Sequence, residues 1–287
     1  MNIMTCYAHG LREAMRRPKM IMLLWLANIA FAAAAYFGFS CAFGAALGNS
    51  GMTVEMLAKT DMNAVIEFLT NSGGRLDDLI TMALLVMVFY AFVSIFLNGG
   101  ILHSLIEQED RKRFGQTFFA GGGRYYGRFF RLTVYSIILW APALIGYFLV
   151  HAVLRALTKN STNEQLTFYF SIFRIALALF LIFLIKMIMD YARIRIATQD
   201  TNKVFVSLLG AVKFVFARFG GTLLLYYLLG LTGWAAFLVF RLINGTFSKN
   251  LTVTVLLGFV LAQLFIASRG WLKIAYQAAE LRYFTGR

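Results

Sequence analysis

Long stretches without a charged side chain dominate the pattern of this 287-residue chain. One covers residues 20–54, and others cover 79–102, 132–154, 219–240 and 250–268. A further apolar stretch, 166–189, is interrupted only by Arg174 and Lys186. A helix needs about 20 apolar residues to cross about 30 Å of hydrocarbon. The pattern therefore predicts six transmembrane helices, at about 20–46, 79–104, 130–154, 166–189, 219–241 and 250–270.

Composition indicates the same class of protein. Hydrophobic residues make up 60% of the chain and charged residues 14%, and the mean hydropathy is +0.71. Such a composition is typical of integral membrane proteins. Backbone groups in lipid must be satisfied within helices or closed barrels, and these continuous stretches lack the alternation of barrel strands. We expect an all-α fold, a polytopic transmembrane bundle in which residues 1–287 form a single domain.

The basic residues are divided unevenly between the two sides of such a bundle. The amino-terminal segment, the connections 103–131 and 190–218 and the carboxy-terminal tail hold nineteen Lys or Arg against seven Asp or Glu. The alternate connections, 47–78, 155–165 and 241–249, hold six of each sign. Because basic residues near span ends stay in the cytoplasm, both termini are predicted to be cytoplasmic.

Three segments on the basic side have an amphipathic, aromatic-rich pattern, at about 3–17, 115–128 and 203–218. Each precedes a predicted span, so the chain repeats one plan three times: an elbow, an outward span and a returning span. Helices of this kind lie at the membrane interface with their cations among the headgroups. The elbows either bind anionic lipid or simply re-orient the chain. Their candidate lipid contacts are Arg12, Arg16, Arg17, Arg124, Arg128, Arg131, Lys213 and Arg218.

A few polar side chains interrupt the predicted spans and form a candidate intramembrane site: Arg174, Lys186, Asp190 and Gln263. The first two are twelve residues apart, which is about 18 Å along a helix. They can therefore snorkel towards opposite interfaces, with Lys186 pairing with Asp190 one turn away. Alternatively, these groups line a polar pathway or form a site for an anionic ligand between helices. Gln263 is expected to bond to a neighbouring helix.

Catalytic patterns are missing from the sequence. It contains no G-x-S-x-G, P-loop or H-E-x-x-H motif, and its three histidines fall in separate segments. The two cysteines, Cys6 and Cys41, have no metal-ligand spacing. We therefore predict a protein that is not an enzyme and has no cofactor or metal. The net charge of +14 lies near span ends, which favours anionic headgroups over nucleic acid as its partner.

Short motifs close the returning spans: Asn98-Gly99-Gly100, Asp190-Tyr191-Ala192-Arg193, and the segment 275–284. With the basic Phe/Gly elbow at 115–128, they resemble the six-helix bacterial membrane domain associated with glycerophosphoryl diester phosphodiesterases, and neighbouring uncharacterised membrane families. The resemblance implies a bacterial cytoplasmic (inner) membrane protein. In that family a separate soluble domain carries out hydrolysis, and this chain has no room for one.

These observations favour a non-enzymatic integral membrane protein that binds lipids or partner proteins as a scaffold or accessory subunit. Its partners would be anionic headgroups on the cytoplasmic side, a membrane protein or a second copy of the chain. The alternative is a component of a transporter or permease for a lipid or small amphiphile. The polar intramembrane residues and a kink at Pro142 would then line the path.

Overall fold

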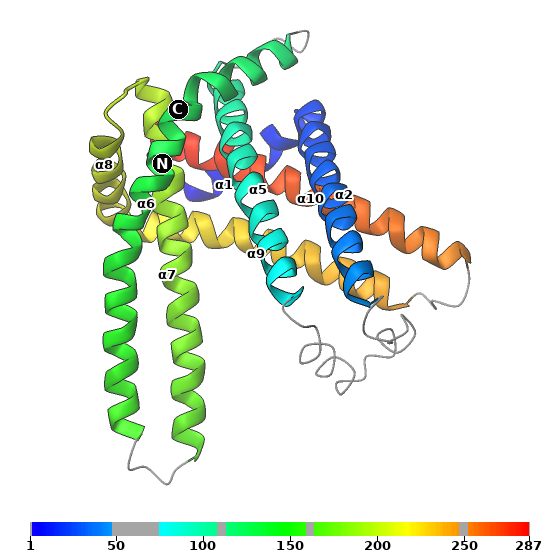
Figure 1. The fold of residues 1–287 in the computed structure, drawn as a ribbon. Coiled ribbons are helices and arrows are strands. Elements are labelled where there is room, and N and C mark those ends of the chain that lie inside the picture. The colour runs from blue at the N-terminus through cyan, green and yellow to red at the C-terminus, as the bar shows by residue number, and fades with distance from the viewer. Residues whose placement is uncertain (1, 48–74, 108–112, 159–163, 247–251, 287) are drawn as a thin grey trace. The chain divides into compact units, whose positions relative to one another are not determined.

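The chain folds into helices throughout the part that the computed structural model describes, residues 2–47, 75–107, 113–158, 164–246 and 252–286 (Figure 1). The elements are α1 (Ile3–Met15), α2 (Pro18–Leu47), α5 (Arg75–Ile106), α6 (Phe114–Thr158), α7 (Glu164–Gln199), α8 (Val204–Ala217), α9 (Phe219–Thr246) and α10 (Thr252–Thr285). Six helices of these residues, α2, α5, α6, α7, α9 and α10, are long and apolar enough to cross a bilayer. The predicted all-α, six-span class is thus confirmed, and the chain is a multi-pass membrane protein.

Two of the three predicted elbows are separate short helices. Asn2 caps α1 by accepting a hydrogen bond from the Met4 backbone N–H at 3.1 Å, and the helix ends just before Pro18 opens α2. The third predicted elbow corresponds to α8, which ends at Ala217. The backbone of the next residue, Arg218, leaves helical geometry (φ −123°).

The second elbow is not a separate helix, because residues 115–128 belong to the 45-residue helix α6. This helix continues through Pro142, and Figure 1 shows its amino-terminal part at an angle to the longer remainder. Glycines bring this first part close to α5. A Cβ added to Gly99 would lie 3.2 Å from the Gly121 carbonyl oxygen, and one on Gly121 would overlap His103.

Packing divides the chain into two compact units, one of residues 22–94 and one of residues 1–21 with 95–287. In the smaller unit, α2 packs against the first part of α5. The Phe31 ring lies 5.5 Å from that of Phe89 and 5.2 Å from that of Tyr90, whose hydroxyl donates to Asn28 at 3.3 Å.

The larger unit has its core at one end of its helices. α1 lies along the carboxy-terminal part of α10, where a Cβ on Gly10 would be 2.6 Å from both the Ala275 carbonyl oxygen and the Ala279 Cβ. α8 packs against α7, and α9 against α10. Buried residues gather near the carboxy-terminal ends of α5, α7 and α10 and near the starts of α6 and α9. This end positions the candidate site.

Candidate functional site

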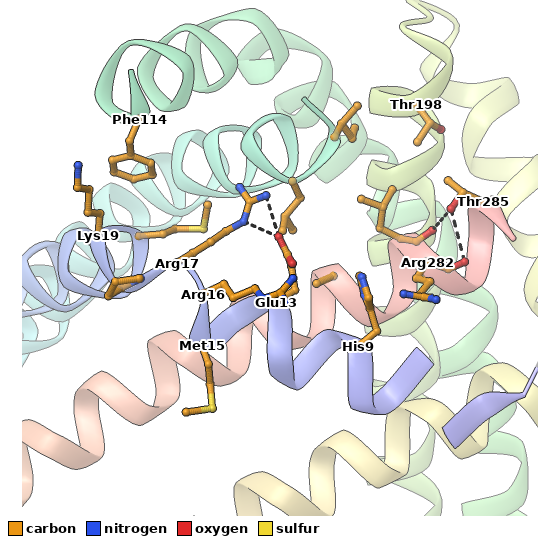
Figure 2. Close-up of a pocket in the computed structure, with 16 residues that line it drawn as sticks. His9, Glu13, Met15, Arg16, Arg17, Lys19, Phe114, Thr198, Arg282 and Thr285 are labelled. Carbon is orange, nitrogen blue, oxygen red and sulfur yellow. Dashed lines mark hydrogen bonds and ion pairs between the residues drawn. The ribbon is translucent and has the colours of Figure 1, made fainter. Parts of the chain in front are cut away.

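A basic cavity of about 1130 Å³ opens beside α1 and the turn that joins it to α2 (Figure 2). The ends of α5, α7 and α10 and the start of α6 complete its wall. Five lining residues are basic or can become so: His9, Arg16, Arg17, Lys19 and Arg282. The cavity therefore combines segments that are distant in the sequence but that all belong to the predicted basic side of the chain.

One ion pair organises the centre of this cavity. Arg17 donates from Nε to a Glu13 carboxylate oxygen at 2.9 Å, and its second terminal nitrogen lies 2.9 Å from the same oxygen. The remaining guanidinium nitrogen donates to the Ser104 carbonyl oxygen, at the end of α5, at 2.6 Å. Because Glu13 is the one carboxylate among the described lining residues and Arg17 neutralises it, Arg16 and Arg282 leave this part of the cavity positively charged.

Two buried nitrogen atoms at this site have no hydrogen-bond partner among the described residues. They are Nδ1 of His9 and Nε of Arg282. Burial and the neighbouring Arg282 guanidinium lower the pKa of His9, with smaller contributions of the same sign from Arg16 and Arg12 and an opposing one from Glu13. Since each of the lowering charges is positive, an anion bound here would favour the protonated imidazole.

Part of the lining is apolar. Met20, Leu105, Ile106 and Phe114 lie at or near the ends of apolar helices and face the same space as the basic groups. Such a site can hold a ligand that carries both a negative group and a hydrocarbon part. Basic pockets between helices at the cytoplasmic side of membranes bind lipid headgroups on this principle.

The other predicted lipid contacts are placed differently. Arg124 and Arg128 both bond to the Asp200 carboxylate, at 2.6 and 2.5 Å. These two guanidinium groups hold the pKa of Asp200 below its usual value. Asp200 itself follows α7 and has a left-handed φ of 45°. The arginines thus join α6 to the end of α7, a role that their spacing did not reveal.

Four more basic residues named as lipid contacts remain outside the basic cavity. Arg131 donates to the Gly127 carbonyl oxygen at 3.2 Å, and the Arg218 guanidinium lies 5.3 Å from the Phe214 ring centroid. Lys213 is exposed on α8, as is Arg12 on α1. Of the eight predicted contacts, therefore, only Arg16 and Arg17 line the cavity.

The four predicted intramembrane residues do not form one site. Arg174 donates to Ser171 Oγ at 2.7 Å and lies 3.4 Å from His151 Nδ1 of α6. Lys186 is about 18 Å further along α7, and its Nζ lies 5.9 Å from the Tyr276 ring centroid of α10. Gln263 precedes Tyr276 by thirteen residues, or about 20 Å of helix. Asp190 pairs with Arg193 at 2.6 Å, not with Lys186, because Arg193 reaches the same carboxylate from one turn further on.

A polar seam nevertheless runs between α7 and α10, which are in contact. We define it by two sets of residues at helical spacing, Lys186, Asp190 and Arg193 on α7, and Arg269, Lys273, Tyr276 and Glu280 on α10. Glu280 is 1% exposed, and neither carboxylate oxygen has a hydrogen-bond partner among the described residues. Its charged neighbours are Asp190, Lys186 and Arg193. Sequence reasoning missed Lys273 and Glu280, although their seven-residue spacing repeats that of Lys186 and Arg193.

The motifs that close the returning spans meet close to this seam. Gln277 donates to Asn98 Oδ1 at 3.1 Å in a buried hydrogen bond between α10 and α5. Tyr191 is fully buried and has Glu280 as a neighbour.

No family model, curated protein or solved structure matches the chain. The membrane class of the protein therefore stands on its six helices, and the family resemblance of these motifs stays a prediction.

Proposed function

We propose that the chain is a non-enzymatic membrane protein that holds an anionic lipid headgroup in the basic cavity and serves as a scaffold or accessory subunit. The observation that carries the proposal is the charge of the cavity: the one carboxylate among its described lining residues is already paired with Arg17, while Arg16 and Arg282 face the same space. Apolar lining residues supply a surface for the start of the acyl chains.

The energetics favour a lipid headgroup over a small soluble anion. Each Lys or Arg near an anionic membrane surface contributes about 1 kcal/mol, and several act together here. Contact between the apolar lining and hydrocarbon adds about 25 cal/mol for each Å² removed from water. A free phosphate would gain only the first of these contributions.

A short-chain lipid pair tests the proposal. Protein in mild detergent is titrated with dihexanoyl phosphatidylglycerol or dihexanoyl phosphatidylcholine, and binding is followed by the rise in melting temperature. We expect a saturable rise with the anionic lipid, because only its headgroup complements the cavity. The double variant Arg16→Gln/Arg282→Gln should bind about thirtyfold more weakly, from two contributions of about 1 kcal/mol.

Arg12→Gln is the matched control. Arg12 is exposed on the same helix as Arg16 but does not line the cavity. The Arg12→Gln variant should therefore bind the anionic lipid with almost the same affinity as the unchanged protein. Equal binding of the two lipids, or an equal loss in Arg12→Gln and the double variant, would contradict the proposed site.

A second candidate function is transport of a lipid or small amphiphile, and the polar seam favours it. Charged groups within long apolar helices are costly and often mark a path or a binding step. Lys186→Ala would then abolish flux of the amphiphile in reconstituted vesicles. Flux that continues in this variant would speak against a path along the seam.

A further inference from the structure

A second cavity, of about 620 Å³, lies between α9 and α10 and is bordered by Phe183 of α7. Its volume falls within the range of small-molecule sites, about 300–1,000 Å³. Its walls are mainly aromatic, with Trp234 and Phe237 from α9 facing Phe265 and Trp271 from α10. These residues offer an extended hydrocarbon chain a large contact surface.

Two tyrosines border one end of this aromatic cavity. The Tyr276 hydroxyl donates to the Tyr226 carbonyl oxygen at 3.1 Å, and the two rings lie 5.0 Å apart. Both tyrosines line the cavity. The cavity therefore ends at the polar seam, to which Tyr276 also belongs.

Positive charge is in excess along the border between the cavity and the polar seam. Arg269 lines the cavity itself, and Lys186 lies 5.9 Å from the ring centroid of Tyr276. Lys273 is partly buried on α10, three residues before Tyr276, and has Lys186 among its charged neighbours. Of the two carboxylates of the seam, Asp190 is bonded to Arg193 and Glu280 is buried beyond Tyr276.

A polar atom of the wall also lacks a partner. Trp271 Nε1 is buried and has no hydrogen-bond partner among the described residues. A buried N–H donor is normally satisfied by protein, water or ligand. Together with the neighbouring cations, this donor suits a ligand that carries acceptor oxygens.

We propose that this aromatic cavity binds an anionic amphiphile, with its hydrocarbon chain between α9 and α10 and its carboxylate or phosphate beside Lys186, Arg269 and Lys273. Charge complementarity selects this occupant over a neutral lipid. The site is separate from the basic cavity, since the two share no lining residue. If binding in the aromatic cavity is refuted, the proposed headgroup site in the basic cavity therefore stands. If the headgroup site is refuted, the proposal for the aromatic cavity stands.

Tryptophan quenching tests the site directly, because Trp234 and Trp271 line it. The protein with Trp25→Phe and Trp140→Phe keeps only these two tryptophans. It is titrated in neutral detergent with 9,10-dibromostearate or with the methyl ester of that acid. We expect saturable quenching by the acid and only a linear, partition-limited loss with the uncharged ester. Similar linear curves for both would overturn the proposal.

Neighbouring alanines give a matched pair of variants that does not touch the charges. Ala236 lines the aromatic cavity, whereas Ala235 is exposed and does not. Ala236→Phe should weaken the saturable phase by about tenfold or more, since each methylene kept out of the cavity costs a factor of about four. Ala235→Phe should leave it unchanged. Equal behaviour of these two variants would place the ligand elsewhere.

Charge is tested with Lys186→Gln/Lys273→Gln, which should weaken binding of the acid by about tenfold through loss of charge-assisted bonds. The control for the double variant is Arg174→Gln, because Arg174 is about 18 Å from Lys186 along α7.

A brominated phosphatidylglycerol distinguishes the source of the ligand. Competition between it and the acid indicates a membrane phospholipid as the natural occupant, whereas quenching by the acid alone indicates a free fatty acid. Unchanged quenching in the double lysine variant would refute recognition of the anionic group.

Discussion

Gly10→Ala should destabilise the protein, although alanine is the better helix former. The added Cβ would lie 2.6 Å from the Ala275 carbonyl oxygen, 2.6 Å from the Ala279 Cβ and 3.0 Å from the Ala279 backbone nitrogen. Two of these neighbours are backbone atoms of a helix and cannot swing aside, so α1 must move away from α10.

The magnitude follows from two opposing contributions. Overpacking by one methyl group costs about 1–3 kcal/mol, and removing a helical glycine gains about 0.5–1 kcal/mol. We therefore expect a net loss of about 1–2 kcal/mol. Gly123→Ala is the control, because a Cβ there meets nothing within 4 Å. That change should stabilise by the propensity gain alone.

Thermal unfolding in mild detergent, followed by intrinsic fluorescence, compares the two variants with the unchanged protein. The melting temperature should fall for Gly10→Ala and rise slightly for Gly123→Ala. Because α1 forms one wall of the basic cavity, Gly10→Ala should also weaken binding of dihexanoyl phosphatidylglycerol. A melting temperature for Gly10→Ala at or above that of the unchanged protein would refute the packing of α1 on α10.

Three other predictions address the charged groups and the topology. Lipid binding in the basic cavity should strengthen as the pH falls from about 7 towards 5. The lowered pKa leaves His9 neutral at pH 7, and a bound anion favours its protonation. In lipid titrations across this pH range, the His9→Gln variant should lose the pH dependence of binding. The change Asp200→Asn releases Arg124 and Arg128 from their carboxylate partner. In nanodiscs, the variant should therefore retain more co-purified anionic lipid than the unchanged protein. An equal or smaller amount of lipid would argue against this release. Single cysteines are introduced at position 61 or 202 of a variant that lacks Cys6 and Cys41. An impermeant reagent should label these two positions from opposite sides of sealed vesicles. Labelling of both positions from the same side would overturn the predicted orientation.

Hydropathy located the spans because the need to cross hydrocarbon depends only on the local sequence. It placed the ends of two of the three returning spans poorly. α7 continues to Gln199 and α10 to Thr285, ten and fifteen residues beyond the predicted ends at 189 and 270. These extensions carry polar groups that hydropathy assigns to water. In the fold some of these groups find partners in neighbouring helices: Gln277, in the α10 extension, donates to Asn98 of α5 in a buried hydrogen bond.

The elbows show what local pattern can and cannot define. Pro18 separates α1 from α2, and non-helical geometry at Arg218 separates α8 from α9. Between Phe114 and Pro142 there is no proline, and glycines at 121 and 122 remain helical in close contact with α5. The amphipathic pattern predicted three elbows, but a separate short helix forms only in the two segments that a backbone break bounds.

Only part of the basic cavity could be predicted from the sequence, because local pattern does not show which charged groups pair in the fold. Its cations follow from charge counting near span ends, and Arg16 and Arg17 were named on that basis. Which cations remain available depends on carboxylates far away in the sequence. Asp200 occupies Arg124 and Arg128 from more than seventy residues away, and the Ser104 carbonyl holds Arg17 across eighty-seven. No local spacing encodes these pairings.

Packing and charge in the larger unit are concentrated at the same end of its helices, and this has an energetic consequence. Away from that end, large apolar side chains such as Phe148 and Phe168 are 61% and 63% exposed and need lipid to cover them. At that end, the guanidinium groups of Arg16 and Arg282 face one cavity and repel one another. An anion that binds only the folded chain relieves this repulsion and stabilises the fold by RT ln(1 + [L]/Kd). Anionic lipid would then act on the stability of the same helix packing that creates its site.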